Sequence, residues 1–252
     1  MQFRGKHYSI QINIPTHHQL ESEVKARFGA GKGFALATMN VDHLVKLGRD
    51  KSFSDAYSQH DLIVADGNPV VWVAKLAGER LELITGSDQV VPLTKWATDC
   101  GVTVAFVGST EEVLDKAAVG LEQAVPGARV VAKISPPFGF DPASDAAGDI
   151  LEQVQASGAR LCFLALGAPK QEVFAARGYR EYPGIGFASV GAGLDFIAGH
   201  QKRAPKWVRA IAMEWLWRMI SNPKRLAKRY FDCAVVLPGH VGSAIIQRRS
   251  DS

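Results

Sequence analysis

Short apolar runs rich in β-branched residues alternate with longer segments of helical periodicity between about Gly33 and Gly191. The short runs predict strands and the longer segments predict helices. The predicted strands cover Phe34–Met39, Asp61–Ala65, Thr103–Val107, Ala128–Lys133, Arg160–Leu166 and Gly186–Val190. The predicted helices cover Asp88–Asp99, Glu111–Ala124, Ser144–Ser157 and Lys170–Tyr179. This alternation predicts an α/β, Rossmann-like fold, with a mostly parallel sheet and helices on both of its faces.

The pattern changes after Gly199, where aromatic and basic residues recur at helical spacing. We expect one helix from Pro205 to Ile220, with an aromatic stripe and a basic face, and a second helix that begins at Pro223. The aromatic stripe consists of Trp207, Ile211, Trp215 and Met219. The chain is therefore expected to divide into an α/β domain, residues 1–199, and a basic amphipathic helical appendage, residues 200–252.

The net charge of +4 hides a strongly basic segment. Residues 202–230 contain nine Lys or Arg and one acidic residue, Glu214, so the remainder of the chain is mildly acidic. A local excess of positive charge indicates a surface for phosphates, in nucleic acid, an anionic lipid or a diphosphate ligand. No apolar run reaches the roughly 18 residues of a transmembrane helix, and the N-terminus lacks the apolar core of a secretory signal. We expect a cytoplasmic protein.

The cysteines and histidines do not predict a metal site. Cys100, Cys162 and Cys233 are far apart and form no Cys-x-x-Cys pair, which argues against a disulfide framework or a zinc site. His17 and His18 have no further ligand at a familiar metal spacing, and we expect them in a solvated loop. No cofactor is expected.

Polar residues follow several of the predicted strands, where an α/β sheet binds its ligands. Asp66 ends one strand and precedes Gly67, Asn68 and Pro69. A carboxylate held there could act as a general base, although an aspartate that caps the next helix would give the same pattern. The two interpretations remain open at this point.

Two other strand ends are candidates for phosphate binding. Lys170, Gln171 and Glu172 follow Gly167-Ala168-Pro169, at a predicted helix N-terminus whose free N–H groups suit a diphosphate. Gly108 and Ser109 precede another helix. A solvated first turn and an ordinary helix cap, respectively, would explain these two patterns equally well.

The glycine-rich segments do not form a nucleotide fingerprint. Gly29–Gly33 satisfies neither the P-loop nor the dinucleotide pattern, and Phe196 stands where the third glycine after Gly191 and Gly193 would be needed. A UDP-sugar epimerase or dehydrogenase shares the α/β fold but requires that fingerprint. A peripheral lipid- or nucleic-acid-binding module would explain the basic segment and leave the strand-end motifs unexplained.

Six motifs in order resemble the WecG/TagA/CpsF family of glycosyltransferases, glycosyltransferase family 26, from about Ala35 to Tyr230. They are Thr38-x-Asn40-x-Asp42-His43, Ala65-Asp66-Gly67-x-Pro69, Thr85-Gly86-Ser87-Asp88, Leu166-Gly167-x-Pro169-Lys170-Gln171-Glu172, Val190-Gly191-Ala192-x-Leu194-Asp195-Phe196-x-Ala198-Gly199, and Arg203-Ala204-Pro205-x-Trp207 with Glu214-Trp215 and Arg229-Tyr230. Each motif alone is weak, whereas six in this order are highly specific.

The resemblance implies an inverting transfer of a hexose from a UDP-sugar to an undecaprenyl-diphosphate-linked sugar, in bacterial cell-surface polysaccharide synthesis. The hexose would be of the N-acetylmannosamine, glucose or glucuronic type. Asp66 matches the general base of the family, and Thr38, Asn40 and Gln171 match residues around its donor and catalytic pocket. The substrate-binding set expected around them is Gly67, Asn68, Arg80, Thr85, Asp88, Gly108, Ser109, Gly167, Pro169, Lys170, Glu172 and Asp195.

The basic appendage matches the segment with which the family docks on the membrane and covers its active site. This implies a peripheral location on the inner face of the cell membrane, at an anionic lipid surface, and no nucleic-acid partner. Each basic side chain near such a surface contributes roughly 1 kcal/mol. The arginines expected to meet the membrane or the acceptor diphosphate are Arg203, Arg209, Arg218, Arg225 and Arg229.

Two features of the sequence refine this expectation. No Asp-x-Asp occurs in the chain, which favours metal-independent catalysis in which cationic groups and helix N-termini stabilise the diphosphate. Family members often carry an arginine two residues before the Thr-Gly of the third motif, where this chain has Leu83, and Arg80 is the nearest arginine before it. The sequence leaves open the donor and acceptor sugars, and whether the protein forms a homo-oligomer.

Overall fold

A parallel β-sheet forms the centre of the protein in the computed structural model, which describes residues 1–201, 204–205, 207–208, 212–221 and 223–250. Its strands are β3 (Phe34–Met39), β4 (Leu62–Ala65), β5 (Val104–Gly108), β6 (Val130–Ile134), β7 (Leu161–Ala165) and β8 (Gly186–Ser189). They lie in the order β4-β3-β8-β7-β5-β6. The α/β prediction is confirmed, and each strand begins and ends within two residues of its expected bounds.

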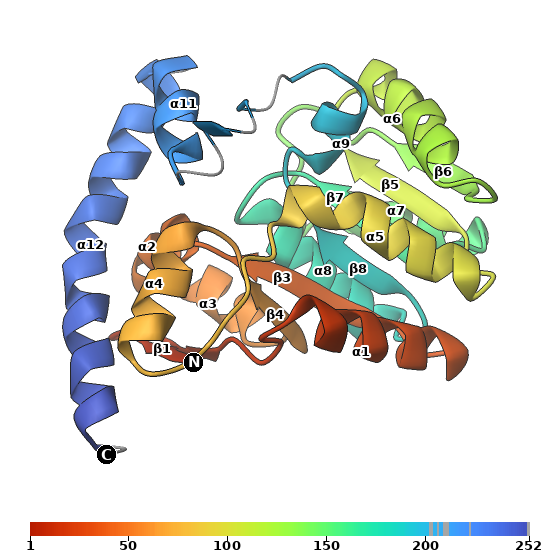
Figure 1. The fold of residues 1–252 in the computed structure, drawn as a ribbon. Helices are drawn as coiled ribbons and strands as arrows, with labels where there is room; N and C mark the ends of the chain where they lie inside the picture. The colour runs from red at the N-terminus through yellow and green to blue at the C-terminus, as the bar shows by residue number, and fades with distance from the viewer. Residues whose placement is uncertain (202–203, 206, 209–211, 222, 251–252) are drawn as a thin grey trace.

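Helices cover both faces of the sheet (Figure 1). One face packs against α1 (His17–Gly29), α5 (Gly86–Asp99), α6 (Glu111–Ala124) and α9 (Gly193–Ile197). The other face packs against α2 (Val41–Arg49), α3 (Lys51–Tyr57), α4 (Asn68–Leu76), α7 (Asp145–Ala156) and α8 (Lys170–Glu181). Because both faces are covered, the central strands are buried along their whole length, which explains their continuous apolar runs.

The N-terminal part of the chain holds elements that the sequence pattern did not predict. Strands β1 (Gln2–Arg4) and β2 (Ser9–Gln11) form an antiparallel pair beside α2 and α4. The expected loop at His17 and His18 is wrong, because both residues lie exposed in the first turn of α1. Thr16 caps that helix by accepting a hydrogen bond from the Gln19 N–H.

The C-terminal segment contains α11 (Glu214–Ser221) and α12 (Pro223–Ser250). The predicted start at Pro223 is confirmed. A single helix from Pro205 to Ile220 is wrong, because Ala212 has a left-handed φ of 59° and α11 begins only at Glu214. Of the predicted aromatic stripe, Ile211 lies outside the described residues.

Helix α12 lies along one side of the α/β body, against α2 and α4 (Figure 1). The hydroxyl of Tyr8 lies 3.1 Å from His240 Nε2 in a buried contact, and the Arg49 guanidinium donates two hydrogen bonds to Asp232. Among the helices that the structure describes, none has both the length and the hydrophobicity that a membrane span requires.

Candidate active site

The register of β3 and β4 brings two residues of the predicted site together at the carboxyl edge of the sheet. Met39 pairs with Ala65, so Asn40 and Asp66 are the next residues on neighbouring strands. The Asp66 N–H donates a hydrogen bond of 2.7 Å to the Met39 carbonyl. Helix α4 is capped by Gly67, at a φ of +104°, so the interpretation of Asp66 as the helix cap is wrong. Asp66 instead directly follows the buried strand β4, and it is half-buried.

The third motif packs directly against β3 and β8. A Cβ atom on Gly86 would lie 3.0 Å from both the Thr38 hydroxyl and the Ser189 carbonyl oxygen, so only a glycine fits there without displacement. The Thr85 side chain caps α5 by accepting from the Asp88 N–H. The close approach of Gly86 to Thr38 places Thr38, buried near the end of β3, beside the N-terminus of α5.

The fourth motif begins α8, as expected, but two of its side chains point inward. Gln171 is 4% exposed and Glu172 is fully buried. Gln171 accepts a hydrogen bond from the Gly191 N–H at 3.2 Å and donates one to the Glu172 carboxyl at 2.8 Å. Glu172 was expected to bind substrate directly, and its burial instead places it beneath the site. The amide of Gln171 joins the loops that follow β7 and β8.

A buried histidine and tyrosine extend this cluster towards α2 and α3. His43 Nδ1 lies 3.3 Å from the Tyr57 hydroxyl, and its Nε2 lies 3.7 Å from Glu172 Oε1. Burial lowers the pKa of His43 to about 3, so the imidazole is neutral and forms no ion pair with Glu172. Burial raises the pKa of Glu172 to about 7 and that of Tyr57 well above its usual value, with Glu172 and Asp66 adding to the effect on Tyr57. The Tyr57 hydroxyl therefore lies in the field of both carboxyl groups.

Asp42 connects the site to α12. Its carboxylate accepts a hydrogen bond of 2.6 Å from Lys46, and the Arg229 Nε of α12 lies 3.3 Å away on the other oxygen. Lys46 also donates to the carbonyl of Ala168, in the loop before α8. Arg229, which was expected to face the membrane or a diphosphate, thus lies against the helix that follows Asn40.

The loop after β5 has a conformation that depends on glycine. Gly108 has a φ of +115°, and a Cβ there would lie 2.5 Å from the backbone of Ala165. Ser109 is a non-glycine residue with a φ of +58°, a strained conformation that is common at binding sites. Its N–H donates to the Ala165 carbonyl, so this loop lies beside the end of β7. Thr110, the next residue, caps α6, so the expected helix cap after Gly108 and Ser109 is present.

Other predicted residues are exposed or half-buried, or lie outside the described residues. Asp88 is exposed in the first turn of α5, and Asp195 lies half-buried in α9. Arg80 is exposed and follows Glu79, whose carboxylate contacts Met1 and accepts from Gln247 of α12. Arg203 and Arg209, and the side chains of Arg218 and Arg225, are not among the described parts of the chain. Among the described residues, no group of three or more His, Cys, Asp or Glu could hold a metal ion.

The geometry is that of a Rossmann-like sheet whose polar residues gather where a ligand binds, and comparison with protein families agrees with the motifs. The family described as "Glycosyl transferase WecG/TagA/CpsF family" matches residues 6–251. The chain belongs to this family. Membership makes it a glycosyl transferase of cell-surface polysaccharide synthesis and implies a nucleotide-sugar donor and a lipid-linked acceptor.

Sequence reasoning assigned no role to several residues that the transferase buries beside these motifs. His43 and Asp42 occur in the first motif, but no local pattern showed that they face α8 and α12. Asp42 and Lys46 are four residues apart on one helix, which is the spacing of an ion pair, so this contact could have been anticipated. Nothing in the sequence indicated that Tyr57 lies beside the site, because a tyrosine near the end of a short helix is common.

Proposed function

We propose that the protein is an inverting glycosyltransferase that moves a hexose from a UDP-sugar to an undecaprenyl-diphosphate-linked sugar. The observation that carries the proposal is the position of Asp66, a carboxylate at the carboxyl edge of the sheet beside Asn40. Inverting transfer needs one base on the acceptor hydroxyl and groups that stabilise the leaving diphosphate. Asp66 is the base, and Thr38, Asn40 and Gln171 surround the donor.

The leaving UDP is stabilised without a metal ion. The N-terminus of α8, with Lys170 in its first turn, supplies N–H groups and a positive charge. The Gly108–Ser109 loop, which touches the end of β7, supports a second part of the donor. Leu83 stands where family members often carry an arginine, so either Arg80 takes its part through a shifted loop or the donor or acceptor sugar differs. The hexose is of the N-acetylmannosamine, glucose or glucuronic type.

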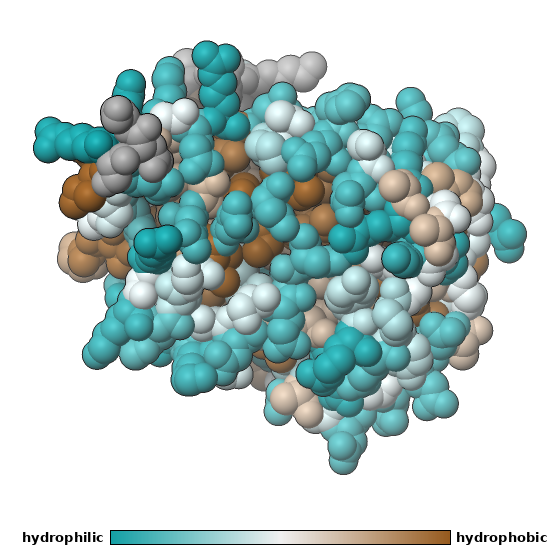
Figure 2. Space-filling model, turned by 90° about the horizontal axis from the view of Figure 1, so that it is seen from below, coloured by the Kyte–Doolittle hydropathy of each residue, from teal (hydrophilic) through white to brown (hydrophobic). Residues whose placement is uncertain are grey.

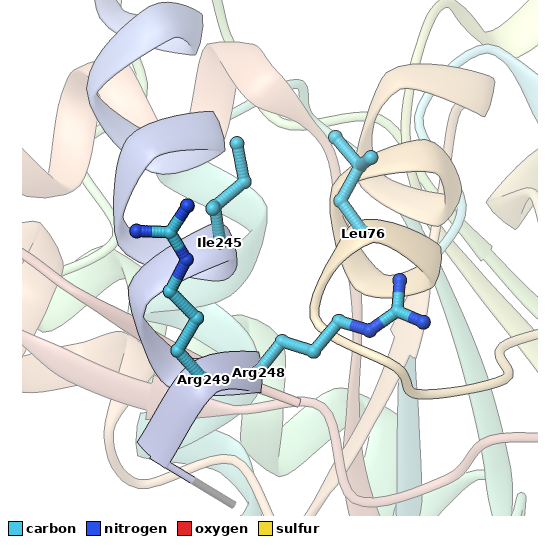
Figure 3. Close-up of a pocket in the computed structure, with 4 residues that line it drawn as sticks. All are labelled: Leu76, Ile245, Arg248 and Arg249. Carbon is cyan, nitrogen blue, oxygen red and sulfur yellow. The ribbon is translucent and has the colours of Figure 1, made fainter. Parts of the chain in front are cut away.

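Residues 200–252 form a unit that docks on the inner face of the cell membrane. The outward face of α12 carries Phe231, Val235 and Ile246, which are 69%, 62% and 65% exposed and are spaced to share one side of the helix. Figure 2 shows small hydrophobic patches at the left edge of the view, the side on which Figure 1 shows α12, and a larger hydrophobic group across the middle of the view. Near the C-terminal end of α12, Ile245 and Leu76 of α4 line a groove of about 410 Å³ flanked by Arg248 and Arg249 (Figure 3). Apolar side chains flanked by arginines suit an anionic bilayer.

The double variant Phe231→Ser/Val235→Ser is expected to bind phosphatidylglycerol vesicles at least about tenfold more weakly than the wild type. Burial of one such side chain contributes roughly 1.5–3 kcal/mol, and tenfold corresponds to about 1.4 kcal/mol. Vesicle flotation at several lipid concentrations measures this. The control is Val119→Ser, a 56% exposed valine on α6 at the other side of the body. Equal binding by the double variant and the control would contradict the membrane role of α12.

The transfer itself is tested with purified protein, short-chain lipid-diphosphate-sugar acceptors and a panel of UDP-sugars, in the presence of EDTA. UDP release and product mass are followed for each pair. A product that forms with one donor and persists in EDTA is the expected result. If none of the UDP-sugars reacts with any acceptor, the proposal is wrong, and binding of the basic segment to nucleic acid becomes the next measurement.

A further inference from the structure

Glu172 lies in the first turn of α8 and is fully buried. Its Oε1 accepts a hydrogen bond from Gln171, the preceding residue of α8, and lies 3.7 Å from His43, in the helix after β3. Gln171 in turn accepts from the N–H of Gly191, in the loop after β8. The His43 N–H donates to the side chain of Asn40, the cap of α2. The buried carboxyl group thus contacts Gln171 and His43 directly and is linked to Gly191 and Asn40 only through these two residues.

The hydrogen bonds fix which way the Gln171 carboxamide points. Its oxygen faces a donor, the Gly191 N–H, and its nitrogen faces an acceptor, the Glu172 carboxyl. If the amide turned over, its oxygen would face the carboxyl oxygen of Glu172 and its NH₂ would face the Gly191 N–H. The contact between the NH₂ and the Gly191 N–H would be repulsive, and so would the contact between the two oxygens while Glu172 is ionised, in a buried place where unpaired polar groups are costly. The Gly191 N–H and the Glu172 carboxyl together favour one orientation of the amide.

No other described side chain is a full hydrogen-bond partner of the Glu172 carboxyl, to which the backbone N–H of Glu172 itself also donates. Its second oxygen, Oε2, is buried and forms no hydrogen bond with any described residue. The charged or titratable side chains around it are His43, Lys46 and Asp42 from α2 and Tyr57 from α3. His43 is neutral and at 3.7 Å is too far for a hydrogen bond, and Lys46 is bound to Asp42 and the Ala168 carbonyl. The contact with Gln171 is accordingly the one strong hydrogen bond that the Glu172 carboxyl makes to a described side chain.

We propose that Glu172 is a positioning residue, which holds the carboxamide of Gln171 in the orientation that the donor pocket requires and so fixes the loop at Gly191. The proposal rests on the proposed function, in which Gln171 lies around the donor. Glu172 neither touches the substrate nor exchanges a proton with it. This role requires an acceptor oxygen at the distance from the Gln171 amide at which Oε1 lies. It does not require the negative charge of the carboxylate.

Two variants separate position from charge. Glu172→Gln keeps an acceptor oxygen at the same distance and removes the charge, whereas Glu172→Asp keeps the charge and withdraws the oxygen by one methylene. We expect kcat of Glu172→Gln to stay within about threefold of the wild type, and kcat of Glu172→Asp to fall at least tenfold, since small misplacements in a site can cost up to about 100-fold. The reverse order, with Glu172→Asp the more active variant, would overturn the proposal.

A double-mutant cycle tests whether the effect passes through Gln171. In a Gln171→Ala background, Glu172→Asp is expected to cause no further loss of kcat, because no amide remains to be positioned. Additive losses would contradict the proposal. Thermal unfolding of each variant shows whether it is folded, and if Glu172→Asp is not, Glu172→Gln decides by itself, since a tenfold or greater loss there refutes a purely positional role.

The side-chain amide resonances of Gln171 give a readout that needs no activity. They are assigned as the pair that is missing from the Gln171→Ala spectrum. We expect the pair to keep its position in Glu172→Gln and to shift in Glu172→Asp. An unchanged pair in Glu172→Asp would count against the proposal. If the wild type transfers no sugar, the proposed function fails, while these spectra still show whether Glu172 orients the amide.

Discussion

Replacement of Asp66 by asparagine is expected to lower kcat of sugar transfer roughly 10²- to 10⁴-fold, the range that a general base contributes. Asparagine has nearly the same shape, so the strand end and its hydrogen bond to Met39, which the backbone makes, should stay intact. What is lost is the group that we propose accepts the proton of the acceptor hydroxyl. Binding of UDP should change little, because the diphosphate site that we propose lies at the ends of other strands.

Measurements of kcat and of UDP affinity on the same preparation test this expectation. A matched control is Asp99→Asn, which changes a half-exposed carboxylate at the last residue of α5, where it pairs with Lys25. Surface ion pairs of this kind contribute little, so the control should keep the kcat and the melting temperature of the wild type. An Asp66→Asn protein that is as active as this control would show that the base is another residue.

Replacement of Gly108 by alanine is expected to lower the free energy of unfolding by about 2–6 kcal/mol. Two costs combine at this position. A φ of +115° is strained for any residue with a side chain, which costs roughly 1–3 kcal/mol. The new Cβ would also lie 2.5 Å from the backbone of Ala165, which cannot move without disturbing β7, and such crowding costs roughly 1–3 kcal/mol.

Gly167→Ala separates the two costs. Gly167 lies in the loop after the neighbouring strand β7 and has a φ of +72°, but a Cβ there would have no atom within 4 Å. This variant should therefore lose only about 1–2 kcal/mol, since it has the strain without the crowding. Denaturant unfolding of both variants measures the difference. Equal losses would mean that the close approach of the two loops does not constrain Gly108.

Local pattern was sufficient for the central sheet and several of its helices. Continuous apolar runs such as Phe34–Met39 predicted buried strands, because a strand covered on both faces exposes no side to solvent and needs no polar residues there. The pattern failed where several explanations fitted the same residues. Leu20, Val24 and Phe28 recur at helical spacing and are the buried face of α1, but the histidine pair before them suggested a loop.

The C-terminal segment shows the opposite error. The spacing of Trp207, Trp215 and Met219 suggested one continuous helix, but periodicity alone does not reveal a break in the backbone. Ala212 adopts a left-handed conformation, for which alanine gives no warning in the sequence. The position of α12 against α2 and α4 was equally hidden, because contacts between elements far apart in the chain leave no local pattern.

The sequence by itself determined the family, the α/β class and the strand ends at which Asn40, Asp66 and Gln171 stand, since each of these follows from residues that are neighbours in the chain. The tertiary structure alone decided which way their side chains face. Lys170-Gln171-Glu172 reads as a solvated first turn, yet Glu172 is buried against His43. Likewise, the sequence suggests that Arg229 is a surface cation, but its guanidinium contacts the carboxylate of Asp42. The reason is that these contacts depend on which strands become neighbours in the sheet and which helices pack beside them, and this arrangement brings together residues more than a hundred positions apart.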